Sequence, residues 1–167
     1  RPGAGRPYAV GADKARSRIV MRLNDAGTAW EETGNGFSFG AMNDHSFVVG
    51  PDNRPWLAYQ DANKGNRPTV VRMNAAGTDW EPVAGGWLTD SEATAPAFVF
   101  SPGPDRTAYV AYESMVGSES RLFIKRLGRS GWESVGGGSL ESVQRFPSRP
   151  SDTGLVAPAL AFSPEGM

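Results

Sequence analysis

The chain has 167 residues, which is enough for one domain with a hydrophobic core. It has no cysteine, which excludes disulfides and thiolate metal sites. Its formal net charge is −1, so it lacks the basic surface typical of a nucleic-acid-binding protein. No apolar run approaches the roughly 18 residues of a membrane-spanning helix. The composition leaves the compartment open, and we favour an extracellular or cell-surface location.

One segment of the chain occurs three times. Residues 22–31 return as residues 72–81 and again, in a shorter form, as residues 126–133. The tryptophans of the three copies, which are 50 and 52 residues apart, are Trp30, Trp80 and Trp132. A period near fifty indicates a stack of similar supersecondary units, each of which buries its apolar face only against a neighbour.

Aligning the copies predicts an all-β chain of four-stranded antiparallel units. We expect one partial domain over residues 1–167, with repeats at about 6–45, 46–96 and 97–158 and a final strand in 159–167. In chain order, the expected strands lie at residues 7–13, 18–23, 30–33, 46–50, 55–61, 69–73, 80–83, 97–100, 108–113, 122–127, 132–135 and 159–162. The first repeat therefore lacks a first strand, and the last strand begins a further repeat.

The residue types support this assignment. The first strand of each repeat is a continuous apolar run, typical of strands buried on both faces, and the third is rich in β-branched residues. Pro82 lies in a fourth strand and indicates an edge position. The sequence Asn-x-x-Gly-Thr joins third and fourth strands and is typical of a hairpin turn. We expect the connections after the fourth strands to begin at Gly34, Gly85 and Gly136, and another loop at 114–121.

With these four strands, the chain resembles β-propeller repeats of the bacterial YVTN/NHL kind. The resemblance covers residues 6–167 and implies that each repeat is one blade. The Gly-His and Trp-Asp marks of WD40 blades are missing, and the glycine pairs follow the tryptophan rather than precede it as in kelch. Residues 25–30 are similar to the Asp-box turn of sialidase-like propellers, although Thr28 is displaced by one position and Asp25 becomes Ala75.

Three blades do not close a ring, because propellers close with roughly four to eight. Two explanations are open. In one, the C-terminal strand pairs with the N-terminal blade of a second copy, and a homodimer forms a six-bladed ring. In the other, the chain is part of a longer polypeptide that supplies the missing blades.

The resemblance implies that the loops after the second and the fourth strands emerge on one face. Aromatic and basic residues of these loops are the expected ligand contacts: Trp87, Phe37, Phe39, Phe146, Arg16, Lys64 and Arg67. The alternative is that the aromatic residues cap the hydrophobic core.

Other conspicuous residues have simpler structural explanations. Because the three tryptophans repeat, we expect them to pack between units. Arg22, Arg72 and Arg126 are expected to pair with glutamates or stack on tryptophans, the alternative being an anion-binding cluster as in sialidases. Asp13 and Asp61, with Glu113 nearby, are expected to accept hydrogen bonds at turns, and a cation site is the alternative. His45, the single histidine, is expected to be a satisfied or solvated side chain, and the alternative is a metal ligand or a catalytic base.

These observations predict a non-enzymatic binding module for a glycan or a protein, with no cofactor, no metal and no nucleic-acid partner. The alternatives are part of a sialidase-like enzyme and a structural extracellular spacer.

Overall fold

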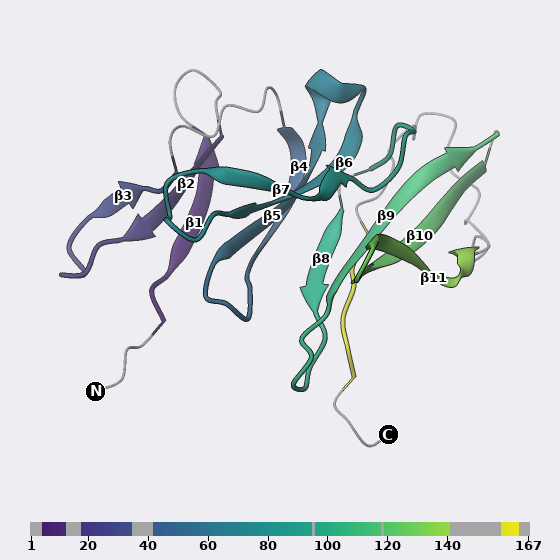
Figure 1. The fold of residues 1–167 in the computed structure, drawn as a ribbon. Coiled ribbons are helices and arrows are strands. Elements are labelled where there is room, and N and C mark those ends of the chain that lie inside the picture. The colour runs from purple at the N-terminus through teal and green to yellow at the C-terminus, as the bar shows by residue number, and fades with distance from the viewer. Residues whose placement is uncertain are drawn as a thin grey trace.

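The computed structural model describes residues 5–12, 18–34, 42–94, 96–117, 119–140 and 158–163. These residues form three antiparallel sheets (Figure 1). The first sheet contains β1 (Tyr8–Ala12), β2 (Arg18–Leu23) and β3 (Trp30–Glu32). The second contains β4 (Met42–Val49), β5 (Pro55–Asp61), β6 (Arg67–Met73) and β7 (Trp80–Trp87). The third contains β8 (Ala97–Phe100), β9 (Ala108–Val116), β10 (Glu119–Gly128) and β11 (Gly131–Leu140).

Each sheet is a meander, in which every strand pairs with the next strand along the chain. The all-β prediction is confirmed, and so are four strands in the second and third sheets and three in the first. Strand β7 lies at a sheet edge, as Pro82 indicated. No helix in the described part of the chain is long and apolar enough to cross a membrane.

The Asn-x-x-Gly-Thr sequences form the predicted hairpin turns. In the first, the Thr28 backbone N–H donates to Asn24 Oδ1 at 2.9 Å, and Gly27 takes the left-handed conformation at φ 70°. The second turn repeats this arrangement, with Thr78 donating to Asn74 Oδ1 at 3.0 Å. An asparagine side chain therefore fixes each turn locally, without tertiary contacts.

The glycine pairs after the tryptophans build a wide bulge inside the fourth strand. Val71 of β6 lies opposite Pro82 and Thr69 lies opposite Trp87, so one residue of β6 stands against four of β7. Strand β11 carries the same insertion opposite β10, at residues 135–138. The prediction that connections begin at Gly85 and Gly136 is therefore wrong, because both strands continue beyond the bulge.

The loop expected at 114–121 is also wrong in extent. Strand β9 continues to Val116 and β10 begins at Glu119, with a tight turn at Gly117, whose φ is 64°. Cross-strand pairing extends here because Glu119 lies opposite Val116 and Ser120 opposite Met115.

The backbone conformation of Ala84 in this bulge leads to a testable prediction. Its φ of 51° is left-handed, and the equivalent positions of the other repeats hold Gly34 and Gly136, at φ 78° and 76°. We expect Ala84→Gly to raise the free energy of unfolding by about 0.5–1 kcal/mol, because relief of the left-handed strain exceeds the added chain entropy. Chemical denaturation measures this change. Ala75→Gly is the control at an exposed turn, and an equal gain there would contradict the explanation.

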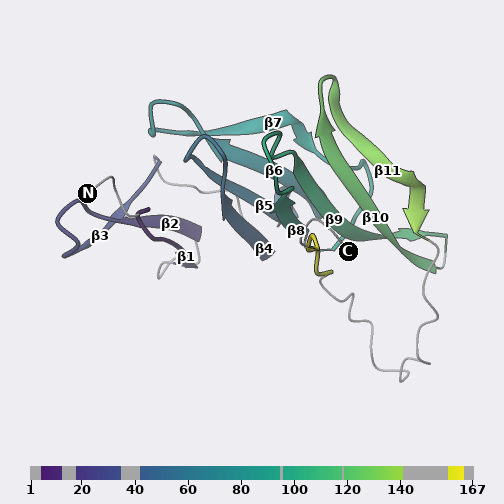
Figure 2. The ribbon, with the colours of Figure 1, turned by 90° about the horizontal axis from the view of Figure 1, so that it is seen from below.

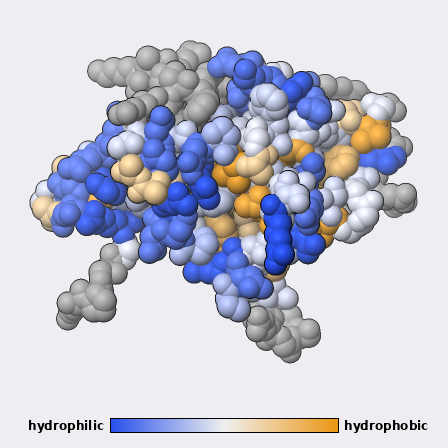
Figure 3. Space-filling view, viewed as in Figure 1, coloured by the Kyte–Doolittle hydropathy of each residue, from blue (hydrophilic) through white to orange (hydrophobic). Residues whose placement is uncertain are grey.

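Each sheet packs its face against the next sheet (Figure 2). Between the first and second sheets the buried residues are Val20, Leu57, Tyr59, Val71, Met73 and Trp80. Between the second and third sheets they are Trp56, Ala58, Val70, Val83, Leu88, Ala93, Phe98, Ala108, Val110 and Tyr112. In the view of Figure 3, apolar side chains gather centrally and the first sheet is mostly hydrophilic.

The repeated tryptophans take one position in this packing. Trp80 is 7% exposed in the core between the first and second sheets. Trp132 packs on the next core and donates from Nε1 to the Val83 carbonyl at 3.2 Å. Packing between units is thus confirmed for both. Trp30 lies on the first sheet, which has no preceding sheet in the described chain, and it is 48% exposed.

Candidate functional site

The structure brings together part of the predicted ligand-binding set. Trp87 ends β7, Arg67 begins β6, and Lys64 lies just before it in the short 3-10 helix η1 (Ala62–Lys64). Because β6 and β7 are antiparallel, the start of one strand meets the end of the other. The remaining predicted contacts lie outside the described residues: Arg16, Phe37, Phe39 and Phe146.

Trp87 and Arg67 are in direct contact. The guanidinium carbon of Arg67 lies 5.3 Å from the Trp87 ring centroid, which is a cation–π distance. Trp87 remains 44% exposed. Arg67 also pairs with Asp90, whose Oδ1 lies 3.7 Å from Nη1. A solvent-facing indole thus carries an oriented cation and a carboxylate beside it.

The backbone next to the Trp87 indole is anchored by the following residue, Leu88. Leu88 is 1% exposed, and its backbone N–H donates to the Pro68 carbonyl at 2.9 Å. The alternative that Trp87 caps the core is wrong for this side chain, since Leu88 takes that role and Trp87 faces solvent. The bulge before Trp87 changes which residues of β7 face the core. As a result, Trp87 faces solvent and Leu88, the next residue, is buried.

Lys125 is a component that the sequence did not single out. It lies opposite Ser134 in β11, in the position that Val71 holds opposite Pro82 and Met21 holds opposite Glu32. Its ammonium donates to the Leu88 carbonyl. Burial lowers the pKa of Lys125, and the negative charge of Asp90 opposes that shift. A charge has replaced an apolar residue of the repeat, and it lies against the backbone carbonyl of the residue that follows Trp87.

Lys64 is exposed at the same end of the sheet. Asp61 caps the start of its helix η1, and the Asp61 Oδ1 accepts from the Asn63 backbone N–H at 3.0 Å; Gly65, with φ 69°, follows the helix. The predicted turn role of Asp61 is confirmed. Asp13, its expected counterpart, lies outside the described residues.

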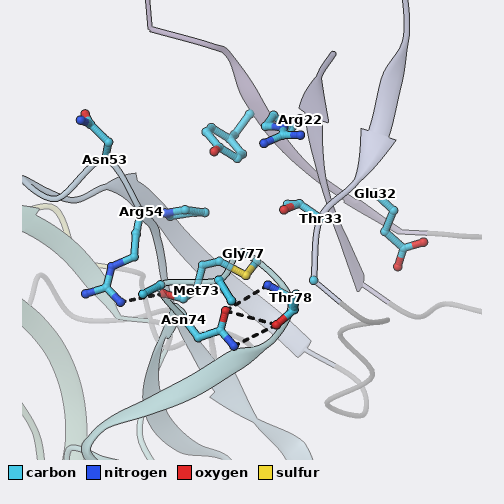
Figure 4. A pocket seen from close by; sticks show the side chains of 14 residues that line it. Arg22, Glu32, Thr33, Asn53, Arg54, Met73, Asn74, Gly77 and Thr78 are labelled. Atoms are coloured by element: carbon cyan, nitrogen blue, oxygen red, sulfur yellow. Dashed lines mark hydrogen bonds between the residues drawn. The ribbon is translucent and has the colours of Figure 1, made fainter. Parts of the chain in front are cut away.

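A second set of hollows lies at the opposite end of the sheets. One, of about 470 Å³ at the junction of the first and second sheets, includes Tyr8, Arg22 and the turn at Asn74 (Figure 4). Another, of about 510 Å³ at the next junction, includes the equivalent Trp56 and Arg72. Equivalent repeat positions line both hollows. We therefore attribute the hollows to the divergence of neighbouring sheets near their turns.

The three repeated arginines are paired, as predicted. Nε of Arg72 donates to Glu81 at 2.7 Å, and the Arg72 guanidinium lies 5.5 Å from the Trp56 ring centroid. Arg126 donates to Glu133 at 3.3 Å. Arg22 lies 3.8 Å from Glu31, with its Nε buried. The glutamates neutralise these cations, so the arginines form separate cross-strand pairs rather than one anion-binding cluster.

Among the described residues, no group of three or more histidine, aspartate and glutamate side chains is arranged to hold a metal ion. Glu113 accepts a hydrogen bond from the Ser120 hydroxyl at 2.9 Å, across the β9–β10 hairpin. His45 is exposed on β4, opposite Tyr59.

The strongest candidate site is therefore the group of Trp87, Arg67, Asp90 and Lys125, which we call the Trp87 site. In comparisons with known proteins, no protein-family model matches the chain, and no curated protein is significantly similar in sequence.

Proposed function

We propose that this protein is a non-enzymatic binding module that holds a glycan at the Trp87 site. The observation that carries the proposal is an indole 44% exposed on a support that is itself buried. Aromatic side chains combine a large apolar surface with few rotatable bonds, so they bind the apolar face of a sugar ring at a low entropic cost. The charged neighbours supply donors and acceptors for hydroxyl groups.

A glycan fits these surroundings better than a protein surface does. Trp87 contacts Arg67, which in turn pairs with the exposed Asp90. The Lys125 ammonium donates to the carbonyl of Leu88, the residue that follows Trp87. Protein interfaces have an extended apolar centre from which charged residues are depleted. An isolated ring among charges instead suits a ligand of ring size with many hydroxyl groups.

The proposal includes a β-propeller architecture, with the three sheets as consecutive blades of a YVTN/NHL-like repeat. This proposal is supported by the equivalent residues at the two junctions between sheets. Trp80 lies in the core between the first and second sheets, and Trp132 packs on the core between the second and third. In this architecture the Trp87 site lies on the face where the second–third and fourth–first loops emerge. An extracellular location remains the corresponding prediction.

A glycan array followed by calorimetry tests the binding function. We expect Trp87→Ala to weaken binding of the selected glycan at least tenfold, about 1.4 kcal/mol, and Arg67→Ala to weaken it less. Val49→Ala, at an exposed apolar residue near the opposite end of the second sheet, is the control and should leave binding unchanged. Binding that ignores Trp87 would refute the site. No binding to any glycan would refute the function and favour a spacer.

A further inference from the structure

Two arginines without partners line the hollow between the second and third sheets, which we call the second hollow. Arg106 lies in the turn between β8 and β9, and Arg129 lies in the turn between β10 and β11. Both residues are exposed, and neither side chain forms an ion pair or a hydrogen bond within the described part of the chain. Arg72 also lines this hollow, but its charge is neutralised by Glu81.

Arg106 takes the place of an asparagine in the equivalent turn of the second sheet. One backbone hydrogen bond of 2.8 Å closes each turn, accepted by the Arg54 carbonyl in the second sheet and by the Thr107 carbonyl in the third. The residues before these acceptors, Asn53 and Arg106, are both left-handed, at φ 58° and 38°. Asparagine tolerates this conformation, whereas arginine rarely adopts it. Backbone strain of this kind accumulates at functional sites.

Arg129 lies in a hairpin turn that differs from the other two. The first and second sheets keep the Asn-x-x-Gly-Thr turn, whereas Gly128 lies directly opposite Gly131 in the third, so this turn is shorter. Arg129 is the third residue after Arg126, as Ala75 is the third after Arg72. Ala75 lines the hollow between the first and second sheets, which we call the first hollow (Figure 4). The two unpaired arginines of the second hollow therefore replace neutral residues of the first.

The carboxylates around the second hollow leave its charge incompletely balanced. Asp52 is bonded to Arg54, with Nε 2.5 Å from Oδ2, and Arg54 lines the first hollow at the position that Thr107 takes in the second. The remaining lining carboxylate is Asp105, which is exposed beside Arg106 in the same turn. Two unpaired arginines and one aspartate give a local charge of 2 − 1 = +1. A single anion would neutralise it.

The remaining lining of the second hollow is largely apolar. Trp56 and Phe100 stand at the positions of Tyr8 and Val49, and their rings pack edge-on with centroids 5.4 Å apart. Leu127 lies beside them in the lining. The volume of about 510 Å³ is within the range of small-molecule sites. An apolar lining together with two unpaired guanidinium groups suits a molecule that has an apolar ring and one acidic group.

We infer that the second hollow binds a small organic carboxylate, in which a single carboxylate group is attached to an apolar ring. The guanidinium groups of Arg106 and Arg129 hold the carboxylate by charge-assisted hydrogen bonds, to which the planar fork of arginine is suited. The ring packs on the aromatic lining at Trp56 and Phe100. The hollow lies at the opposite end of the sheets from the Trp87 site, so this is a second ligand site, independent of glycan binding.

Calorimetric titration of the full chain with naphthoate tests the site. We expect the wild type to bind naphthoate, and Arg106→Asn combined with Arg129→Ala to bind it at least tenfold more weakly, because these changes restore the neutral residues of the first hollow. Both arginines are exposed, so circular dichroism should show an unchanged fold. The matched control is Arg6→Ala combined with Lys64→Ala, which removes the same charge from exposed residues outside the hollow and should leave the affinity unchanged.

Two further probes test the class of ligand. Naphthamide has the ring without the charge, and acetate has the charge without the ring, so each should bind at least tenfold more weakly than naphthoate. A wild type that does not bind naphthoate, or a double variant that binds it equally well, would overturn the inference. Equal affinity for either probe would show that the ligand class is wrong. Glycan binding is a separate readout, so none of these results bears on the Trp87 site.

Discussion

Replacing Trp80 by alanine is expected to lower the free energy of unfolding by about 3–5 kcal/mol, the range for truncating a buried tryptophan. Trp80 is 7% exposed and packs among Val20 of the first sheet and Leu57 and Met73 of the second. Its removal leaves a cavity at the junction on which the first sheet depends, because that sheet has three strands and no other described neighbour. Urea denaturation followed by circular dichroism measures the loss.

Trp30→Ala is the matched control, since Trp30 holds the same repeat position on the first sheet. Its effect on the free energy of unfolding should stay within about 0.5 kcal/mol, as for exposed substitutions. Equal losses in the two variants would contradict the claim that the tryptophan acts by packing on the preceding sheet. It would mean that the residue stabilises the hairpin of its own sheet.

The strands were predictable because their causes are local and repeated. Asn74 bonds its own turn, and each strand pairs with the next, so aligning three copies located both. The bulge was not predicted, although Gly85 and Gly86 were conspicuous. Sequence spacing does not reveal that one residue of β6 faces four of β7, because register depends on cross-strand hydrogen bonds.

The Trp87 site was predictable only in part. Trp87 attracted attention because it follows Gly85 and Gly86 outside the repeat consensus, and Arg67 because it lies in a connecting loop of the alignment. Asp90 and Lys125 come from segments 35 residues apart and meet through the packing of two sheets. One signal was present in the sequence: Lys125 is a charge where the other copies have Val71 and Met21. A break in a repeat is therefore more informative about function than the repeat itself.

Alkaline pH is expected to unfold the protein, because two buried tyrosines must stay neutral. Burial raises the pKa of Tyr112 from 10.0 to about 12 and raises that of Tyr59 further, with the Asp61 charge adding to the second shift. Above pH 10 the unfolded chain loses these protons while the folded chain keeps them. The stabilisation is therefore complete below pH 10 and is lost as the pH rises through the folded-state values.

For Tyr112 alone the loss between pH 10 and pH 12 is about 3 kcal/mol, from 1.36 kcal/mol for each pKa unit. We expect Tyr112→Phe and Tyr59→Phe each to flatten the alkaline decline in urea midpoints. Lys125 acts in the opposite direction, because its lowered pKa adds stability as the pH approaches 10.5. Its Lys125→Met variant should decline more steeply than the wild type.

Tyr109→Phe is the control for the alkaline series, because this ring lies at the face of the third sheet and is only half-buried. It should leave the pH dependence close to that of the wild type. If Tyr109→Phe flattened the decline as much as Tyr112→Phe, the cause would be the total number of ionising tyrosines. If only the buried pair mattered, the alkaline transition would report opening of the two junctions, since Tyr59 belongs to one core and Tyr112 to the other.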